Sequence, residues 1–197
     1  MQATLCFGGS FNPIHYGHLR TSEAIAKRLG FDRVLLIPSA QPPHKPASAD
    51  LAAATDRLAM CQLAVSHDPT LFSVSDLEIL RPGPSYTLDT AKELQLAGMK
   101  TVNWLIGADM VKILPKWHQA QKLLEEVHFV IMARPGFVFD WQTLPREFRV
   151  LKEHVVEAPL IDISATEIRS RIRAGESIQG LTPEPVIGFI REHGLYR

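Results

Sequence analysis

The chain has 197 residues, of which 46% are hydrophobic and 21% are charged, and this length favours one globular domain. Those fractions are typical of a soluble folded protein, and they exclude a disordered, collagen-like or disulfide-stapled chain. Lys plus Arg equals Asp plus Glu at 21 each, so the chain lacks the net positive charge of a general nucleic-acid coat. No window approaches about 18 uninterrupted apolar residues, which excludes a membrane-spanning helix.

Short apolar segments alternate with segments of helical periodicity along most of the chain. We predict strands at residues 4–7, 34–37, 72–74, 102–106, 129–132 and 155–156. Several of them are apolar throughout, which is typical of parallel strands covered by helices on both faces. The sequence therefore predicts an α/β fold with a doubly wound, Rossmann-like parallel sheet, whose ligands bind beyond the carboxyl ends of the strands.

The helices between these strands are indicated by apolar residues spaced three and four apart. The stripes are Leu19, Ile25, Ala26 and Leu29; Leu51, Ala54, Leu58, Cys61 and Val65; Ala165, Ile168 and Ile172; and Val186 and Ile190. The last helix is expected at about residues 184–193, where Val186 and Ile190 follow Pro183 and Pro185. We expect one domain over residues 1–197, with residues 164–197 as a small C-terminal helical portion.

The only cysteines, Cys6 and Cys61, lie in apolar-periodic segments and form no CxxC pair. We interpret both as buried thiols, the alternative being a reactive thiol. The first residues lack the basic stretch of a signal peptide, and together these features predict a cytoplasmic protein.

A proline-rich segment follows the second strand. It contains Pro42, Pro43 and Pro46, with His44 and Lys45 between them. Proline fixes φ and removes an N–H donor, so we expect a semi-rigid loop and not a helix. This loop is either a surface connector or a lid that carries the lysine and the histidine over a site at the strand ends.

The turn after the first strand has the features of an anion site. Gly8 and Gly9 allow a ligand to approach the backbone closely, and Gly17 leaves no side chain between two histidines. If a helix begins near residue 16, His15 and His18 lie at its first turn, beside free N–H groups and the positive end of the helix dipole. Imidazoles with helix-end amides suit a phosphate. The turn lacks both GxGxxG and the GxxxxGK[ST] loop. Metal binding by this pair is the weaker alternative because no further ligand lies nearby.

A second anion site is indicated near residue 164. Ser164 and Glu167 have the spacing of a capping box, which by itself indicates only a capped helix. Arg169 lies one turn into that helix and is placed to reach back to an anion, together with the hydroxyls of Ser164 and Thr166. A charge-assisted hydrogen bond contributes about 1.5–3 kcal/mol, so side-chain cations would dominate the binding of a triphosphate.

Residues 8–18, GGSFNPIHYGH, resemble the HxGH signature of the nucleotidyltransferase superfamily, and residues 163–169, ISATEIR, resemble its ISxTxxR signature. Between them stand PPHK (42–45), SYTLDT (85–90), IGAD (106–109), LPKW (114–117) and RPG (134–136). This ordered series spans nearly the whole chain and is similar to bacterial nicotinate-nucleotide adenylyltransferases. Many members of that family have Asp where this chain has Asn12, which bears on any metal-organising role there, although an amide still bonds the backbone.

The resemblance implies an enzyme that joins ATP and nicotinate mononucleotide into nicotinate adenine dinucleotide and releases pyrophosphate, in NAD biosynthesis. His18 would hold the α-phosphate, and His15 with the backbone of Gly8, Gly9 and Ser10 the neighbouring oxygens. Lys45, Ser164 and Arg169 would take the β- and γ-phosphates, and the resemblance adds Arg134 and Thr166 to the ATP contacts. No acidic cluster forms a metal cage, so Mg²⁺ would arrive mainly on the triphosphate.

The second substrate is expected at the fourth strand and after it. Asp109 is interpreted as binding a ribose hydroxyl or, alternatively, as capping the next helix. Trp117 would stack on the nicotinate ring, with ordinary core packing as its alternative, whereas Trp104 is assigned to the core. Backbone N–H groups near Thr87 and His118, as the family implies, would favour the acid over the amide.

Two alternative functions remain compatible with the sequence: a related adenylyltransferase acting on nicotinamide mononucleotide, and a non-catalytic ATP-binding sensor. The expected partners are the small-molecule substrates, with no nucleic acid and no membrane. The sequence leaves open whether identical chains assemble into a homo-oligomer.

Overall fold

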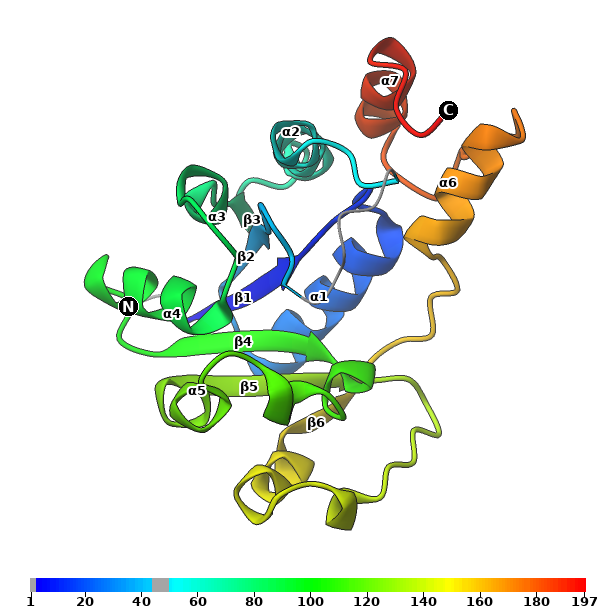
Figure 1. The fold of residues 1–197 in the computed structure, drawn as a ribbon. Coiled ribbons are helices and arrows are strands. Elements are labelled where there is room, and N and C mark those ends of the chain that lie inside the picture. The colour runs from blue at the N-terminus through cyan, green and yellow to red at the C-terminus, as the bar shows by residue number, and fades with distance from the viewer. Residues whose placement is uncertain (1–2, 44–49) are drawn as a thin grey trace.

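The computed structural model describes residues 3–43 and 50–197 and contains a six-stranded parallel sheet with helices on both faces (Figure 1). All six predicted strands are confirmed, most of them one to three residues longer. Their bounds are β1 Thr4–Gly9, β2 Arg33–Pro38, β3 Phe72–Val74, β4 Val102–Gly107, β5 Val127–Ala133 and β6 Val155–Glu157. His44, Lys45 and Pro46 of the predicted lid lie outside the described residues, which include Pro42 and Pro43.

The strand order is β3-β2-β1-β4-β5-β6. From β1 the chain builds the sheet outward through β2 to β3, then returns to the other side of β1 and continues through β4, β5 and β6. The two halves meet where β1 pairs with β4, with Cys6 opposite Trp104. This order is that of a doubly wound sheet, and the crevice at its reversal point opens at the carboxyl ends of β1 and β4. The predicted fold class is thereby confirmed.

Seven α-helices and four short 3₁₀ helices are found in the described residues. The α-helices are α1 Tyr16–Leu29, α2 Ala54–Val65, α3 Leu77–Leu80, α4 Thr87–Leu96, α5 Ala120–Glu126, α6 Ala165–Arg173 and α7 Glu184–Glu192. The 3₁₀ helices are Ala108–Met110, Leu114–Lys116, Trp141–Thr143 and Arg146–His154. The sequence reading missed α3, α4 and α5, which are short or weakly amphipathic.

The buried side chains form two clusters, one on each face of the sheet. Along β1, Leu5 and Phe7 enter the cluster beneath α1 and α2, whereas Cys6 enters the cluster beneath α4 and α5. This alternation follows from the two-residue period of a strand, and it explains why both faces of β1 are apolar. The predicted burial of Cys6 and Cys61 is confirmed, and burial raises the pKa of both thiols.

The stripe predicted for α2 is partly wrong. Leu51 precedes the helix and Leu58 is only half-buried, whereas the inward face carries Arg57, Met60 and Cys61. The apolar spacing identified the helix correctly. The inward face, however, includes the buried Arg57 in place of the predicted Leu58, its neighbour in the chain.

The C-terminal helices share a core with the sheet. Ile168 of α6 and Val186 and Ile190 of α7 join the cluster that contains Leu5 of β1. In Figure 1, α7 lies next to α2 and α6 lies beside the start of α1. In the described part of the chain, no helix is long and apolar enough to cross a membrane.

Candidate functional site

Two cavities of about 530 Å³ each open at the carboxyl ends of the strands, the first at β1 and β4 and the second at β4 and β5. We call them the first cavity, which contains Gly8, Trp117 and His118, and the second cavity, which contains Arg134 and Phe137. Their walls have residues in common: His15, His18, Gly107, Asp109, Met132 and Ile163. The two histidines therefore stand where one cavity passes into the other.

Most of the predicted site residues are brought together here. The first cavity is lined by Gly8, Gly9, Ser10, His15, His18, Thr87, Asp109, Trp117, His118 and Ser164. The second is lined by His15, His18, Asp109 and Arg134. Lys45 lies outside the described residues. Residues from both distant signatures thus reach one cavity.

Arg169 and Thr166 lie beside the first cavity and are not part of its lining. Arg169 Nη1 donates to the carbonyl oxygen of Asn12 at 2.9 Å, and its Nη2 donates to Thr166 Oγ1 at 3.5 Å. Asn12 itself lines the first cavity, so the guanidinium lies directly behind the wall. Ser164 caps α6 as predicted, accepting the Glu167 N–H at 3.1 Å, while the Glu167 carboxylate pairs with Arg171.

His15 and His18 form a stacked pair at the start of α1. Their ring centroids are 3.7 Å apart with 28° between the planes, and Phe11 meets the His18 ring edge-on. His15 is 5% exposed, and burial lowers its pKa to about 4. Its Nδ1 has no hydrogen-bond partner among the described residues. His15 is therefore a neutral imidazole at neutral pH, and it contributes hydrogen-bonding capacity and not a positive charge.

The tautomer of His18 follows from one contact. Its Nδ1 accepts the backbone N–H of His15 at 3.3 Å, which requires this nitrogen to carry no proton. A neutral ring then holds its proton on Nε2. His18 lines both cavities, so the ring presents an N–H donor at the place where they join. Such a donor is suited to an oxygen that gains negative charge during a reaction.

The adjacent glycines have a packing reason as well as the predicted one. A Cβ on Gly8 would lie 2.5 Å from the Trp104 indole, and one on Gly9 would lie 3.1 Å from the Phe11 ring. Trp104 is 3% exposed and belongs to the core, as predicted, yet its edge also forms part of the first cavity. The two aromatic rings therefore support the turn that the ligand would approach.

The Asn12 side chain ties two distant segments, residues 50–52 and Tyr196, to this turn. Its Nδ2 donates to the Asp50 carbonyl at 2.7 Å, and its Oδ1 accepts the Ala52 N–H at 3.0 Å. The Tyr196 hydroxyl also donates to Oδ1, at 2.8 Å, and burial raises the pKa of that phenol. The expectation that an amide bonds the backbone here is confirmed. Because one partner is an acceptor and another a donor, an amide satisfies both, whereas an ionised carboxylate does not.

We expect Asn12→Asp to lower the free energy of unfolding by about 1–3 kcal/mol at pH 7, because a carboxylate oxygen would face the Asp50 carbonyl at hydrogen-bond distance. Urea denaturation of both proteins measures this difference. Burial and that carbonyl raise the pKa of the introduced carboxyl, and the protonated form donates as the amide does. The deficit should therefore shrink between pH 7 and pH 4. Equal stabilities at pH 7 would contradict the assignment.

A buried carboxyl that the sequence reading missed supports the opposite wall. Glu78 is 4% exposed, lines the first cavity and accepts the Thr90 hydroxyl at 2.6 Å. Arg81 Nη2 donates in turn to that hydroxyl at 2.8 Å. Burial raises the pKa of Glu78. Since Thr90 belongs to α4, these contacts hold the beginning of α4, at Thr87, against the cavity. The RPGPSYTLDT stretch (81–90) contains Arg81 and Thr90 and could have drawn attention to these two residues. No neighbouring sequence pattern indicates that Glu78 is buried beside them.

Aromatic residues gather at the end of the first cavity remote from Arg134. Tyr86 and His118 stack with centroids 4.1 Å apart, and both line this cavity. Trp117 is half-buried at the end of the 3₁₀ helix Leu114–Lys116 and lines it as well. A half-buried indole in a cavity wall is suited to stack on a planar ring. Asp109 is exposed directly after β4, which lies beside β1 as predicted; it belongs to the 3₁₀ helix Ala108–Met110, which has no side-chain cap.

Among the described residues, no three His, Cys, Asp or Glu side chains gather in a way that could hold a metal ion. The potential ligand groups of the site are imidazoles, amides and hydroxyls, with Asp109 as the carboxylate shared by both cavities. This donor set does not form a protein cage for a hard cation.

Residues 6–171 match the family model described as cytidylyltransferase-like. The probable nicotinate-nucleotide adenylyltransferase of Roseiflexus sp. (strain RS-1) is 41% identical over 192 residues, which cover 96% of this chain and 96% of that protein. Its counterpart in Yersinia enterocolitica is 40% identical over 214 residues, which cover 97% and 94%.

Solved structures show the same fold. The Plasmodium falciparum nicotinic acid mononucleotide adenylyltransferase complexed with NaAD matches with a TM-score of 0.78 at 20% identity, over 100% of this chain and 98% of that one. The same protein complexed with APC matches with a TM-score of 0.76. With family model, relatives and fold in agreement, the chain belongs to the nicotinate-nucleotide adenylyltransferases of the cytidylyltransferase-like family.

Proposed function

We propose that this protein transfers the adenylyl group of ATP to nicotinate mononucleotide, forming nicotinate adenine dinucleotide and pyrophosphate. The observation that carries the proposal is the pair of cavities that meet at His15 and His18. A transfer between two nucleotides needs two binding sites that share the reacting phosphorus, and this arrangement supplies both. The names of the relatives and the NaAD complex of a protein with the same fold support the same substrates.

The first cavity suits the mononucleotide and the second the adenosine of ATP. Trp117 and the Tyr86–His118 stack give the first cavity a platform for a pyridine ring. Asp109, at the junction, has the position for a ribose hydroxyl. Arg134 lines the second cavity, so its predicted ATP contact fits there. The triphosphate would then follow the glycine turn towards Ser164 and Arg169.

The reaction needs orientation and charge stabilisation more than a proton acceptor. A phosphate oxygen of the mononucleotide is already a nucleophile, and it forms a bond to the α-phosphorus while the bond from that phosphorus to the bridging oxygen breaks. The electron pair leaves with pyrophosphate. The protein aligns the two groups and stabilises the charge that develops. His18 would donate its Nε2–H to an α-phosphate oxygen, and the backbone of the glycine turn would hold the neighbouring ones.

The divalent ion is proposed to be Mg²⁺ bound to ATP. The residues described form no cage for it, so its ligands would be mainly phosphate oxygens and water. Bound in this way, it would supply charge neutralisation on the departing pyrophosphate. Two buried, unpaired cysteines agree with a reducing cytoplasm as the compartment.

Preference for the acid would come from the beginning of α4. Tyr86 and Thr87 lie at that helix end and line the first cavity, so the N–H groups of the first turn and the positive end of the dipole would face the pyridine substituent. A carboxylate accepts from such donors with both oxygens, whereas a carboxamide would direct its NH₂ group towards one of them. An unsatisfied buried donor costs about 1–3 kcal/mol, which corresponds to about fivefold to 150-fold in kcat/KM, and the middle of this range is above tenfold.

Pyrophosphate release with MgATP alone, with nicotinate mononucleotide and with nicotinamide mononucleotide tests the proposal. We expect release only when a mononucleotide is present, with kcat/KM at least about tenfold higher for the acid. A higher value for the amide would assign the other adenylyltransferase activity. Binding of MgATP without release in any mixture would leave the sensor function.

A further inference from the structure

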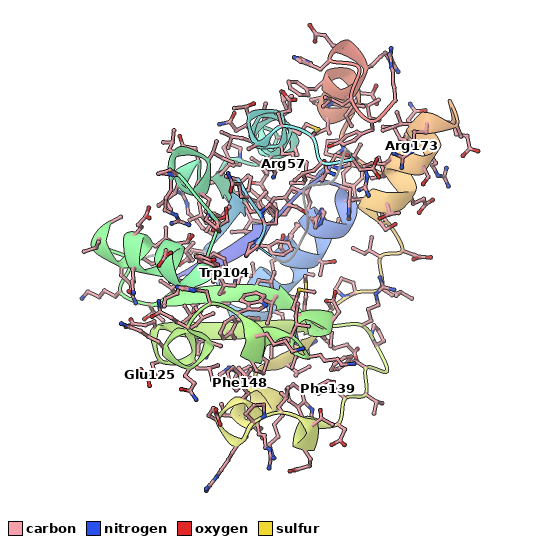
Figure 2. The ribbon with its side chains drawn as sticks, in the orientation of Figure 1. Arg57, Trp104, Glu125, Phe139, Phe148 and Arg173 are labelled. Carbon is pink, nitrogen blue, oxygen red and sulfur yellow. The ribbon has the colours of Figure 1, made fainter. Side chains whose placement is uncertain are left out.

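Arg57 is a buried cation that joins the two loops at the edge of the first cavity. It is 1% exposed and points inward from α2 (Figure 2). Its Nη1 donates to the carbonyls of Ser10 at 2.8 Å and Ser39 at 2.7 Å. Its Nη2 donates to Ala40 at 3.1 Å and its Nε to Ala52 at 2.9 Å. One guanidinium thus links the loop after β1, the loop after β2 and the residues before α2.

These contacts determine which way two peptide groups face. Ser10 and Ser39 line the first cavity, whereas Arg57 does not line it and is closed to solvent. A carbonyl oxygen that accepts from Arg57 therefore points towards α2 and away from the cavity. Because a carbonyl oxygen carries partial negative charge, this orientation keeps two repulsive groups away from a bound phosphate.

Among the described residues, Arg57 has no ion-pair partner. Within residues 3–43 and 50–197, no carboxylate forms an ion pair with it, and its four hydrogen bonds all go to neutral carbonyls. A guanidinium stays protonated even when burial lowers its pKa. A buried cation without a carboxylate is costly, and an anion in the adjoining cavity offsets that cost.

We propose that Arg57 is a positioning residue for the triphosphate: it acts through Ser10 and Ser39, without touching the substrate, and places positive charge behind them. The inference rests on the proposed function, because it assumes that a triphosphate occupies the first cavity along the glycine turn. It predicts that replacing Arg57 weakens ATP binding more than a core substitution that lowers the stability of the fold.

The test compares the dissociation constant of MgATP for the wild type, Arg57→Lys and Arg57→Met by calorimetry at 15 °C. Arg57→Met removes the charge and all four bonds, and we expect affinity to fall at least about twentyfold. Arg57→Lys retains the charge but offers one nitrogen instead of a planar fork, so we expect a loss of about fivefold. Circular dichroism at the same temperature establishes that each variant is folded, and if Arg57→Met is unfolded the decision rests on Arg57→Lys.

Met60→Ala is the matched control. Met60 is fully buried one turn further along α2 and makes only core contacts, so its truncation lowers the melting temperature without moving either loop. We expect its dissociation constant for MgATP to stay within about twofold of the wild type. Wild-type affinity in both Arg57 variants, or an equal loss in Met60→Ala, would overturn the proposal. If the wild type binds MgATP but releases no pyrophosphate, the proposed function fails while the Arg57 comparison remains decisive.

Discussion

Replacing His18 by alanine is expected to lower kcat by about 10²-fold or more, with a much smaller change in KM for either substrate. His18 lines both cavities, and its Nδ1 is occupied by the His15 N–H, so Nε2 carries the proton. That N–H would meet an α-phosphate oxygen whose negative charge grows as the phosphorus is attacked. The interaction is therefore stronger in the transition state than in the bound substrates, and its loss lowers kcat.

Steady-state rates of pyrophosphate release, with each substrate varied in turn, measure this effect. His67→Ala is the control, since His67 is an exposed histidine after α2, far from either cavity wall, and should retain full activity. A His18→Ala enzyme that keeps near-normal turnover would refute the assigned role. A rise in KM with unchanged kcat would instead mean that His18 binds substrate and transition state equally.

The second large effect is expected from Gly17→Ala, which should lower kcat/KM by about 10²-fold. An added Cβ would lie 2.8 Å from Cε1 and Nδ1 of His15 and 3.1 Å from the Ile163 carbonyl oxygen. The His15 ring is buried and stacked on His18, so a displacement of the His15 ring also displaces His18. A shift of either group moves the two histidines relative to the substrates, and misplacement by about 1 Å is enough for a loss of this size.

The matched control is Gly188→Ala, in α7. A Cβ there meets nothing within 4 Å, and the position is exposed. Alanine is favoured over glycine in a helix interior by about 1 kcal/mol, so Gly188→Ala should raise the melting temperature and keep full activity. The same preference acts at Gly17, in the first turn of α1. A loss of activity in Gly17→Ala would therefore come from the displaced histidines and not from a destabilised helix. Wild-type kcat/KM in Gly17→Ala would show that the histidines tolerate displacement.

Local signals account for most of the fold. Short apolar segments identified all six strands, and several are apolar throughout because strands covered on both faces need apolar residues on both. The helices that were missed carry weak stripes: α3 has four residues, and the inward face of α4 includes Thr90. The α2 stripe was displaced because Arg57, a charged residue, occupies an inward position that a hydrophobicity pattern assigns to the surface. An arginine in register with Met60 and Cys61 was the signal available.

The site likewise contains residues that local motifs identified and residues that only the fold brings there. The HxGH and ISxTxxR patterns identified the two signatures because their residues are close together in the chain and their types match the chemistry of phosphate binding. The buried residues that support these two segments could not be predicted from the sequence. Glu78 and Arg57 act through partners such as Thr90 and Ser10, and their role depends on burial, which a residue type alone does not reveal.

The amino-acid order by itself determined the alternation of strands and helices, the positions of the histidine and ISATEIR segments, and the family. These depend on periodicity and on short spacings, which are properties of neighbouring residues. The tertiary structure alone decided that two cavities meet at His15 and His18, that Arg169 bonds the Asn12 carbonyl, and that Tyr196 reaches Asn12 across 184 positions. Such contacts follow from how the sheet and its helices pack, and the free energy of packing depends on the whole chain at once.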